Sequence, residues 1–159
     1  MKINKAYEMV FKEIIKPKEY QRKFDISDEL VFITPNSYFG FVFAKKGIPF
    51  NLELIKNATQ KIDILNIVKP ENLFKKTNHF IALHQQGLIC VLKNENRKIY
   101  INQKYLSFFE DCAEFYQEKD RSIVAVLEQG QVVGAIMPIR YTEEVEREWN
   151  SIVGIALTL

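Results

Sequence analysis

The feature that most constrains the fold is a series of short β-rich segments separated by tight-turn signals. Residues 29–34 and 38–45 flank Pro-Asn-Ser, and the segments SIVAVLE and QVVGAIMP flank Gln129-Gly130. β-Branched and aromatic residues on both sides of a short polar turn are typical of β-hairpins. Further strands are expected at 61–68, 79–85, 88–93 and 98–101. The sequence therefore predicts a mainly antiparallel sheet.

Two other segments have the periodicity of an amphipathic helix. Residues 2–16 precede Pro17, which ends a helix, and they carry apolar side chains at helical spacing: Ile3, Tyr7, Val10 and Ile14. A second helix is expected at 103–117, because Asn102 is a good N-cap. Its apolar residues again share one face: Tyr105, Phe108, Phe109, Cys112, Phe115 and Tyr116.

Each expected helix is followed by a hairpin, so the order helix, strand, turn, strand occurs at 2–45 and again at 103–140. No linker interrupts the chain, and its 159 residues are the size of one ordinary domain. We therefore expect a single α+β domain of two helix–hairpin halves over residues 1–141. Thr142 is expected to cap an acidic helix within residues 142–159, whose apolar end continues as a helix or becomes a strand.

The composition argues against several classes of protein. A net charge of +2 is too small to indicate a nucleic-acid partner by itself. The N-terminal segment is charged throughout, and no apolar run reaches the length of a membrane span. We therefore expect a soluble cytoplasmic protein with no membrane partner. Cys90 and Cys112 lie far apart and lack neighbours at ligand spacing, so two buried free thiols are expected rather than a disulfide or a zinc site.

No pattern of residues indicates catalysis or a cofactor. The six glycines do not form a phosphate-binding loop. His79 and His84 are five residues apart on one expected strand, so they face opposite sides of the sheet and cannot easily share a metal. Neighbouring acidic residues such as Glu110 and Asp111 point in different directions on a helix. We expect no enzymatic activity, no metal and no cofactor.

The most basic feature is a lysine stripe on the first expected helix, formed by Lys2, Lys5, Lys12 and Lys16. Such a face is able to follow the phosphates of double-stranded DNA, with an affinity that falls as salt rises. It is also the ordinary solvent-facing side of an amphipathic helix. The second expected helix is acidic, which weighs against a DNA-facing surface made of both helices.

The segment KIYINQKYLSFFEDCAEFYQEKDRSIVAVLEQGQVVGAIMPIRY resembles the end of the bacterial sliding clamp, the β subunit of the replicative DNA polymerase. KYLSFFED is similar to the family's YLLD-like helix start, and AIMPIRY is similar to its final VMPMRL strand. LVFITPNSYFGFVF resembles the clamp hairpin that begins with an ITNGH-like strand. The resemblance implies a domain of two βαβββ halves whose helices line a hole for DNA.

The resemblance also implies a peptide cleft. In the family, the residues of the MPMRL end help to form a cleft for short hydrophobic peptides of polymerases and other replication proteins. The matching candidates here are Met137, Pro138, Ile139 and Arg140. Pro138 cannot donate to a sheet, so its strand lies at an edge or ends there. This chain departs from the family because residues 142–159 follow the matched end.

These features favour a non-enzymatic binding module that is related to, or mimics, a DNA sliding-clamp domain. It would act on DNA or on replication proteins, and one domain would need several copies to close a ring. The alternative is a small interaction or inhibitor protein of a phage or mobile element, with no role on DNA. That protein would use residues 142–159 to form homo-oligomers or to bind a partner.

Overall fold

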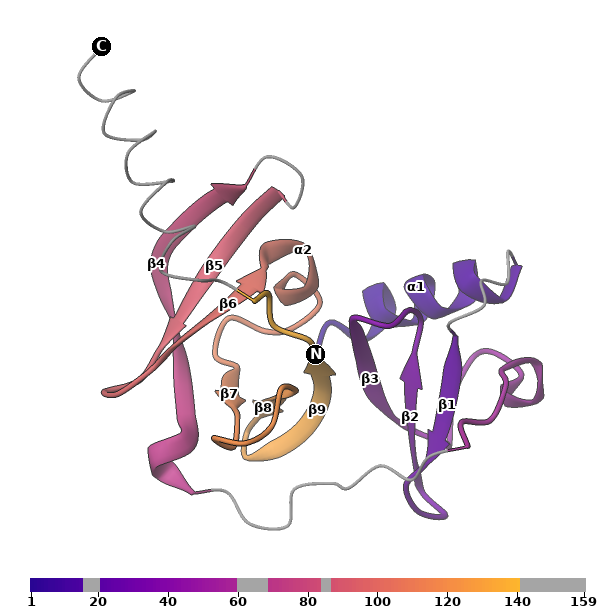
Figure 1. Ribbon diagram of the computed structural model, residues 1–159. Coiled ribbons are helices and arrows are strands. Elements are labelled where there is room, and N and C mark those ends of the chain that lie inside the picture. Colours follow the sequence, from indigo (N-terminus) through magenta and orange to yellow (C-terminus); the bar gives the residue numbers. More distant parts are fainter. Residues whose placement is uncertain (16–20, 60–68, 84–86, 141–159) are drawn as a thin grey trace.

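The computed structural model describes residues 1–15, 21–59, 69–83 and 87–140 (Figure 1). The order of its elements is α1 (Ile3–Ile15), β1 (Arg22–Asp25), β2 (Leu30–Thr34), β3 (Phe39–Ala44), β4 (Leu73–Leu83), β5 (Gly87–Lys93), β6 (Lys98–Asn102), α2 (Gln103–Leu106), β7 (Glu114–Tyr116), β8 (Val124–Glu128) and β9 (Gln131–Ile136). Two 3₁₀ turns, at Leu52–Leu54 and Pro70–Asn72, lie between β3 and β4. The mainly β, α+β character predicted from the sequence is confirmed.

The strands of the described residues form one sheet in the order β1-β2-β3-β9-β8-β7-β4-β5-β6, and every neighbouring pair is antiparallel. The two expected hairpins are present as β2–β3 and β8–β9. The last strand, β9, therefore lies inside the sheet, between β3 and β8. It joins the three N-terminal strands to the rest of the molecule.

The junction between β3 and β9 depends on two glycines. Gly40 and Gly134 lie in adjacent registers of this pair. A Cβ atom on Gly134 would lie 2.7 Å from the Gly40 carbonyl oxygen and 2.7 Å from the Phe109 ring. No larger residue fits there without displacing backbone, so the close approach of β3, β9 and Phe109 explains the glycine.

Both edges of the sheet are partly covered by neighbouring chain. At β1, the Lys23 amide donates to the Lys56 carbonyl (2.9 Å) and the Ala58 amide donates to the Lys23 carbonyl (2.8 Å). At the opposite edge, the Ile139 amide donates to the Tyr100 carbonyl of β6 (2.8 Å). Residues just after the central strand β9 thus meet the terminal strand β6, so this part of the sheet curls back on itself. Covered edges oppose pairing with other chains.

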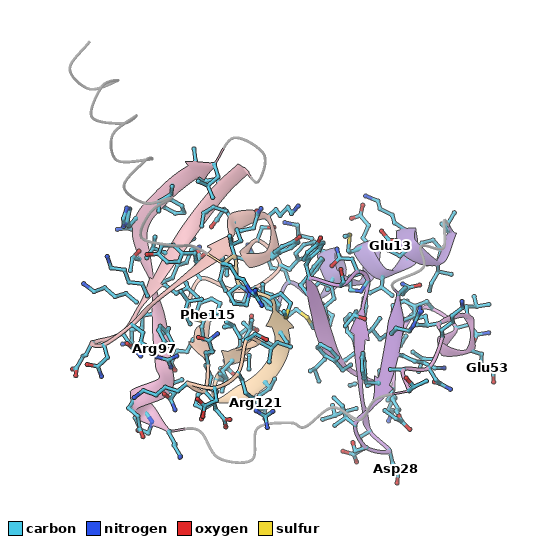
Figure 2. All side chains as sticks on the ribbon, viewed as in Figure 1. Glu13, Asp28, Glu53, Arg97, Phe115 and Arg121 are labelled. Atoms are coloured by element: carbon cyan, nitrogen blue, oxygen red, sulfur yellow. The ribbon has the colours of Figure 1, made fainter. Side chains whose placement is uncertain are left out.

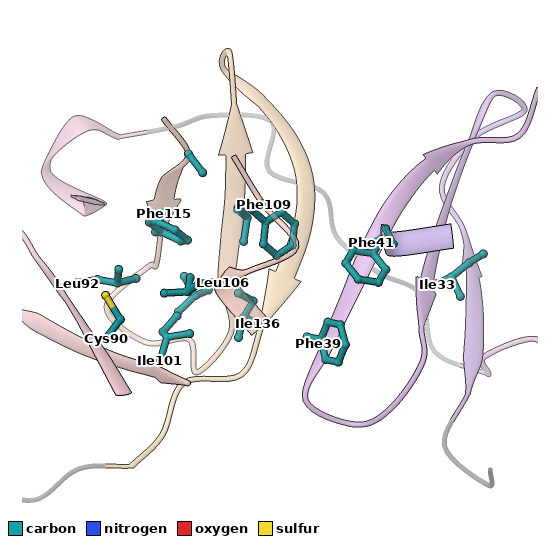
Figure 3. Packing of buried hydrophobic residues seen from close by; sticks show 14 of the residues in the cluster. Ile33, Phe39, Phe41, Cys90, Leu92, Ile101, Leu106, Phe109, Phe115 and Ile136 are labelled. Carbon is teal, nitrogen blue, oxygen red and sulfur yellow. The ribbon is translucent and has the colours of Figure 1, made fainter. Parts of the chain in front are cut away.

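The curled part of the sheet encloses an apolar core. Cys90, Leu92, Ile101, Leu106, Phe115 and Ile136 are buried and point toward one another (Figure 3). On the other side of β9, α1 covers β3 through Ala6, Val10 and the stacked rings of Tyr7 and Phe43 (5.2 Å). Phe109 and Phe41 (ring centres 5.9 Å apart) connect these two regions into one core.

The predicted helix over 103–117 is wrong beyond its first turn. Asn102 does cap the helix, since its side chain accepts from the Lys104 amide (3.0 Å), but α2 ends at Leu106. Phe115 and Tyr116 are both buried and neighbour each other, which suits a strand covered on both faces. Pairing of β7 with β4 and β8 overrides the helical pattern there. The acidic second helix and its DNA-facing surface are therefore not present.

One smaller expectation changes with this result. Cys112 lies in the turn after α2 and is exposed rather than buried, whereas Cys90 is buried as expected. Other expectations lie outside the described residues: the strand at 61–68, the helix after Thr142, and the positions of Lys16 and His84. Among the helices that the structure describes, none has the length and apolarity needed to cross a lipid bilayer.

Candidate functional site

The four residues proposed as a peptide cleft line one surface pocket. Met137, Pro138, Ile139 and Arg140 follow β9, and we call this segment the strap. Together with Tyr38, Asn102, Lys104 and Tyr105, they surround a pocket of about 440 Å³, which we call the strap pocket. The strap residues are adjacent in sequence, but the other four come from the β2–β3 turn and the start of α2. Only the tertiary fold brings these segments together.

Two backbone hydrogen bonds fix the strap. The Met137 amide donates to the Tyr38 carbonyl (2.7 Å), and the Ile139 amide donates to the Tyr100 carbonyl (2.8 Å). Pro138 stands between these two donors, at a position where the missing N–H removes neither bond. Of the two alternatives for this proline, the strand end is correct and the edge strand is wrong, because β9 has neighbours on both sides.

The walls of the strap pocket are mostly apolar and aromatic. Tyr38 is 56% exposed and stacks on Tyr105 with ring centres 6.3 Å apart. Met137 is 36% exposed, so a large part of its side chain is open to solvent. Ile139 instead packs against the small cluster of Ile81, Ile89 and Val91. Ile139 thus ties the lining of the pocket to this apolar cluster, and Met137 adds an adaptable apolar side chain at the surface.

Among the residues that the structure describes, the charged side chains that line the strap pocket are both cationic. Lys104 lies with its Nζ 5.0 Å from the centre of the Tyr105 ring, and Arg140 is exposed at the other end of the strap. Within the part of the chain that the structure describes, which ends at Arg140, no carboxylate lines this pocket. Sequence reasoning identified the strap but missed Tyr38, Asn102, Lys104 and Tyr105. The sequence signal that could have indicated Tyr38 is its position directly after the Pro-Asn-Ser turn.

The lysine stripe of α1 is largely engaged with the protein itself. The Lys5 ammonium donates to the Ser107 hydroxyl (2.7 Å) and carbonyl (3.2 Å) and lies 4.8 Å from the Phe108 ring centre. Lys12 forms an ion pair with Glu8 one turn away (3.1 Å). Lys2 is exposed, and its backbone amide donates to the Phe108 carbonyl (2.8 Å). DNA binding by this stripe stays a prediction.

A larger pocket, of about 760 Å³, lies where β4, β5 and β7 meet, and it carries charges of both signs. It is lined by Pro70, Glu71, Leu73, Lys75, Lys93, Asn94, Glu95, Asn96 and Glu114. Beside it, the Arg97 guanidinium donates to the Gln117 carbonyl (2.7 Å) and to the Asn72 side chain (3.3 Å), which fixes the β5–β6 turn against β7 (Figure 2). Mixed charges on exposed side chains give this pocket no evident ligand preference.

The titratable and thiol groups do not form a reactive centre in the part of the chain described. Burial raises the pKa of the Cys90 thiol, which keeps it protonated and unreactive. No three histidine, cysteine or carboxylate side chains gather there at metal-binding distances. The Met1 ammonium pairs with Glu128, although burial lowers the pKa of this amine.

Comparison with protein-family models, with curated proteins and with solved structures found no significant match for this chain.

Proposed function

We propose that this protein is a non-enzymatic binding module of the sliding-clamp type, which takes short apolar segments of replication proteins in the strap pocket. The observation that supports it is the gathering of Met137, Pro138, Ile139 and Arg140 around one pocket with two tyrosines. These four residues are the ones that the resemblance to the clamp end identifies. The resemblance and the geometry thus point to the same surface.

The composition of the pocket suits peptide recognition. Ligand pockets are mostly apolar, with a few polar groups that fix orientation. Tyrosine and arginine are enriched among the residues that dominate protein–protein affinity, and Tyr38, Tyr105 and Arg140 supply both types. The strap is held at both ends by backbone hydrogen bonds, so binding would cost little ordering of the receptor.

Of the two partners considered, the structure lends more support to a protein than to DNA. Two of the stripe lysines are already engaged, Lys5 with Ser107 and Lys12 with Glu8. The long second helix that would complete a DNA-facing surface of the clamp type is replaced by α2 and β7. A clamp-like use of this chain therefore rests on its peptide pocket.

Selection from a random peptide library tests the proposal. The full chain would be immobilised and compared with Met137→Glu, which places a carboxylate on a partly exposed side chain of the pocket. Leu88→Glu is the matched control, since Leu88 is also an exposed apolar residue but lies on β5, outside the strap pocket. We expect apolar peptides to be enriched on the wild type and on Leu88→Glu, and to be lost on Met137→Glu. Equal enrichment on all three proteins would refute the proposal.

A further inference from the structure

Helix α1 carries a row of apolar side chains that stays partly exposed. The row repeats at every fourth position, and its members are Ile3, Tyr7, Phe11 and Ile15. Ile3 is 41%, Phe11 49% and Ile15 61% exposed. We call this row the α1 ridge. Because its members are neighbours on one surface, they form a contiguous apolar patch, which is a candidate interaction surface.

The α1 ridge is not the side by which α1 packs on the sheet. Ala6 and Val10 face the core and are fully buried. Of the ridge, Tyr7 does turn inward, since its ring stacks on Phe43 with ring centres 5.2 Å apart. Phe11 continues the row one turn further on and remains half exposed. Packing of the chain on itself therefore does not explain the apolar residues of this row.

A second row, with both signs of charge, borders the α1 ridge. It consists of Asn4, Glu8 and Lys12, each one position after a ridge residue. Glu8 and Lys12 form an exposed ion pair (3.1 Å) one turn apart. A partner with charge of one sign would meet a like charge at one of these two places. A second copy that runs antiparallel instead brings Glu8 of each copy beside Lys12 of the other, so that both contacts are between opposite charges.

The α1 ridge is also symmetric about its middle. When the helix direction is reversed about the point midway between Tyr7 and Phe11, Ile3 comes to lie opposite Ile15. The two aromatic residues of the ridge then face each other's positions as well. A two-fold interface requires such a self-complementary surface. Rows of residues four apart are also the ridges that most often interdigitate between packed helices, with axes crossing at about 50°.

We infer that the α1 ridge is the interface of a two-fold dimer of this chain, in which the two α1 helices pack antiparallel. The inference goes beyond the proposed function, because no residue of the ridge lines the strap pocket. It also differs from a ring of the clamp type, whose helices face the DNA hole. The ridge is about 20 Å long and about 10 Å wide, a footprint of about 200 Å². Stable interfaces bury about 800 Å² per partner, so we expect a weak dimer that forms as concentration rises.

Sedimentation velocity of the full chain over a series of concentrations tests the inference. Phe11→Glu places a carboxylate at the middle of the ridge. Because this half-exposed ring is buried in both copies of the dimer, we expect the dissociation constant to rise about tenfold to a hundredfold. Leu88→Glu is the matched control, since Leu88 is 46% exposed but lies on β5, and it should leave the dissociation constant unchanged. Circular dichroism of each variant would show that the fold is retained.

Charge reversal tests the antiparallel arrangement. Glu8→Lys and Lys12→Glu each place like charges at both contacts between the copies, so each variant alone should dimerise at least about tenfold more weakly than the wild type. An equimolar mixture of the two variants restores opposite charges at both contacts, and it should form heterodimers with near wild-type affinity. Each variant also loses the Glu8–Lys12 ion pair within its own helix, but mixing cannot restore that pair. Recovery on mixing therefore reports a contact between copies.

Four results would overturn the inference, and none of them bears on the strap pocket. The first is a chain that stays monomeric up to about 1 mM, where even a very weak dimer is half formed. The second is a dimer that Leu88→Glu weakens as much as Phe11→Glu does. The third is a mixture of the charge variants that dimerises no better than either variant alone. The fourth is a dimer that survives Phe11→Glu but is lost in Ile152→Glu, which would assign the contact to the C-terminal segment.

Discussion

Replacement of Gly134 by alanine tests the junction on which the whole sheet depends. The added methyl group would lie 2.7 Å from the Gly40 carbonyl oxygen and from two atoms of the Phe109 ring, where contacts below 3.0 Å are essentially never seen. β3 must therefore move away from β9, and Phe109 must also shift. Overpacking of this kind costs about 1–3 kcal/mol. A less flexible unfolded chain offsets about 0.4–1 kcal/mol of that loss.

We therefore expect Gly134→Ala to lower the free energy of unfolding by a net of about 0–2.6 kcal/mol, with about 1.3 kcal/mol at the centre of that range. Urea denaturation followed by fluorescence and circular dichroism measures it, as a lower midpoint with an unchanged slope. The double variant Gly134→Ala/Phe109→Leu supplies the control, since it removes the ring contact but keeps the contact with the Gly40 carbonyl. Measured against Phe109→Leu alone, the added Gly134→Ala change should lower the free energy of unfolding by less than it does in the wild type, but by more than zero. A stabilising Gly134→Ala would show that β9 does not pair with β3 as described.

Three further predictions concern the thiols and the lysines. Burial raises the pKa of the Cys90 thiol above its ordinary value of 9.0 in the folded state. The native state therefore keeps this proton at a pH where the unfolded state loses it, and the free energy of unfolding falls as pH rises above 9.0. Urea unfolding from pH 8 to 10 should show a shallower fall of that free energy for Cys90→Ala than for the wild type. A thiol reagent should label exposed Cys112 quickly and Cys90 only on unfolding, and equal rates would contradict the burial of Cys90. If the lysine stripe contacts DNA phosphates, anisotropy titrations of duplex DNA should show binding that weakens as salt rises. The triple variant Lys5→Glu/Lys12→Glu/Lys16→Glu should then bind more weakly than the wild type. Equal binding by both proteins would exclude a DNA contact by the stripe.

Local signals in the sequence predicted the elements whose neighbours in space are also neighbours in the chain. The β2–β3 and β8–β9 hairpins were found because each pairs across its own turn. Helix α1 was found because its periodicity is long and Pro17 follows it. Its buried face was less accurate, since Ile3 is exposed and Glu13 is buried. Periodicity fixes the direction of a face only roughly when apolar residues surround most of a helix.

The missed features depend on contacts between distant parts of the chain. Residues 103–117 carry a helical pattern, but β7 forms because β4 and β8 offer hydrogen bonds on both of its sides. The candidate site shows the same limit. Its strap was visible in the sequence through a family resemblance, whereas Tyr38 and Tyr105 join it only because β3 pairs with β9. Sequence periodicity carries no information about that pairing.

The strap has two structural roles at once, and this couples ligand binding to the stability of the fold. Its hydrogen bonds to Tyr38 and Tyr100 join β9 to the turn before β3 and to the terminal strand β6, so it closes the curled part of the sheet. The same residues form one wall of the strap pocket. A ligand that binds only the closed arrangement must stabilise that closure, by about 2.7 kcal/mol at a concentration one hundred times its dissociation constant. Hydrogen exchange at the Met137 and Ile139 amides should therefore slow on binding, and an unchanged rate would mean that a ligand in the strap pocket does not depend on the strap.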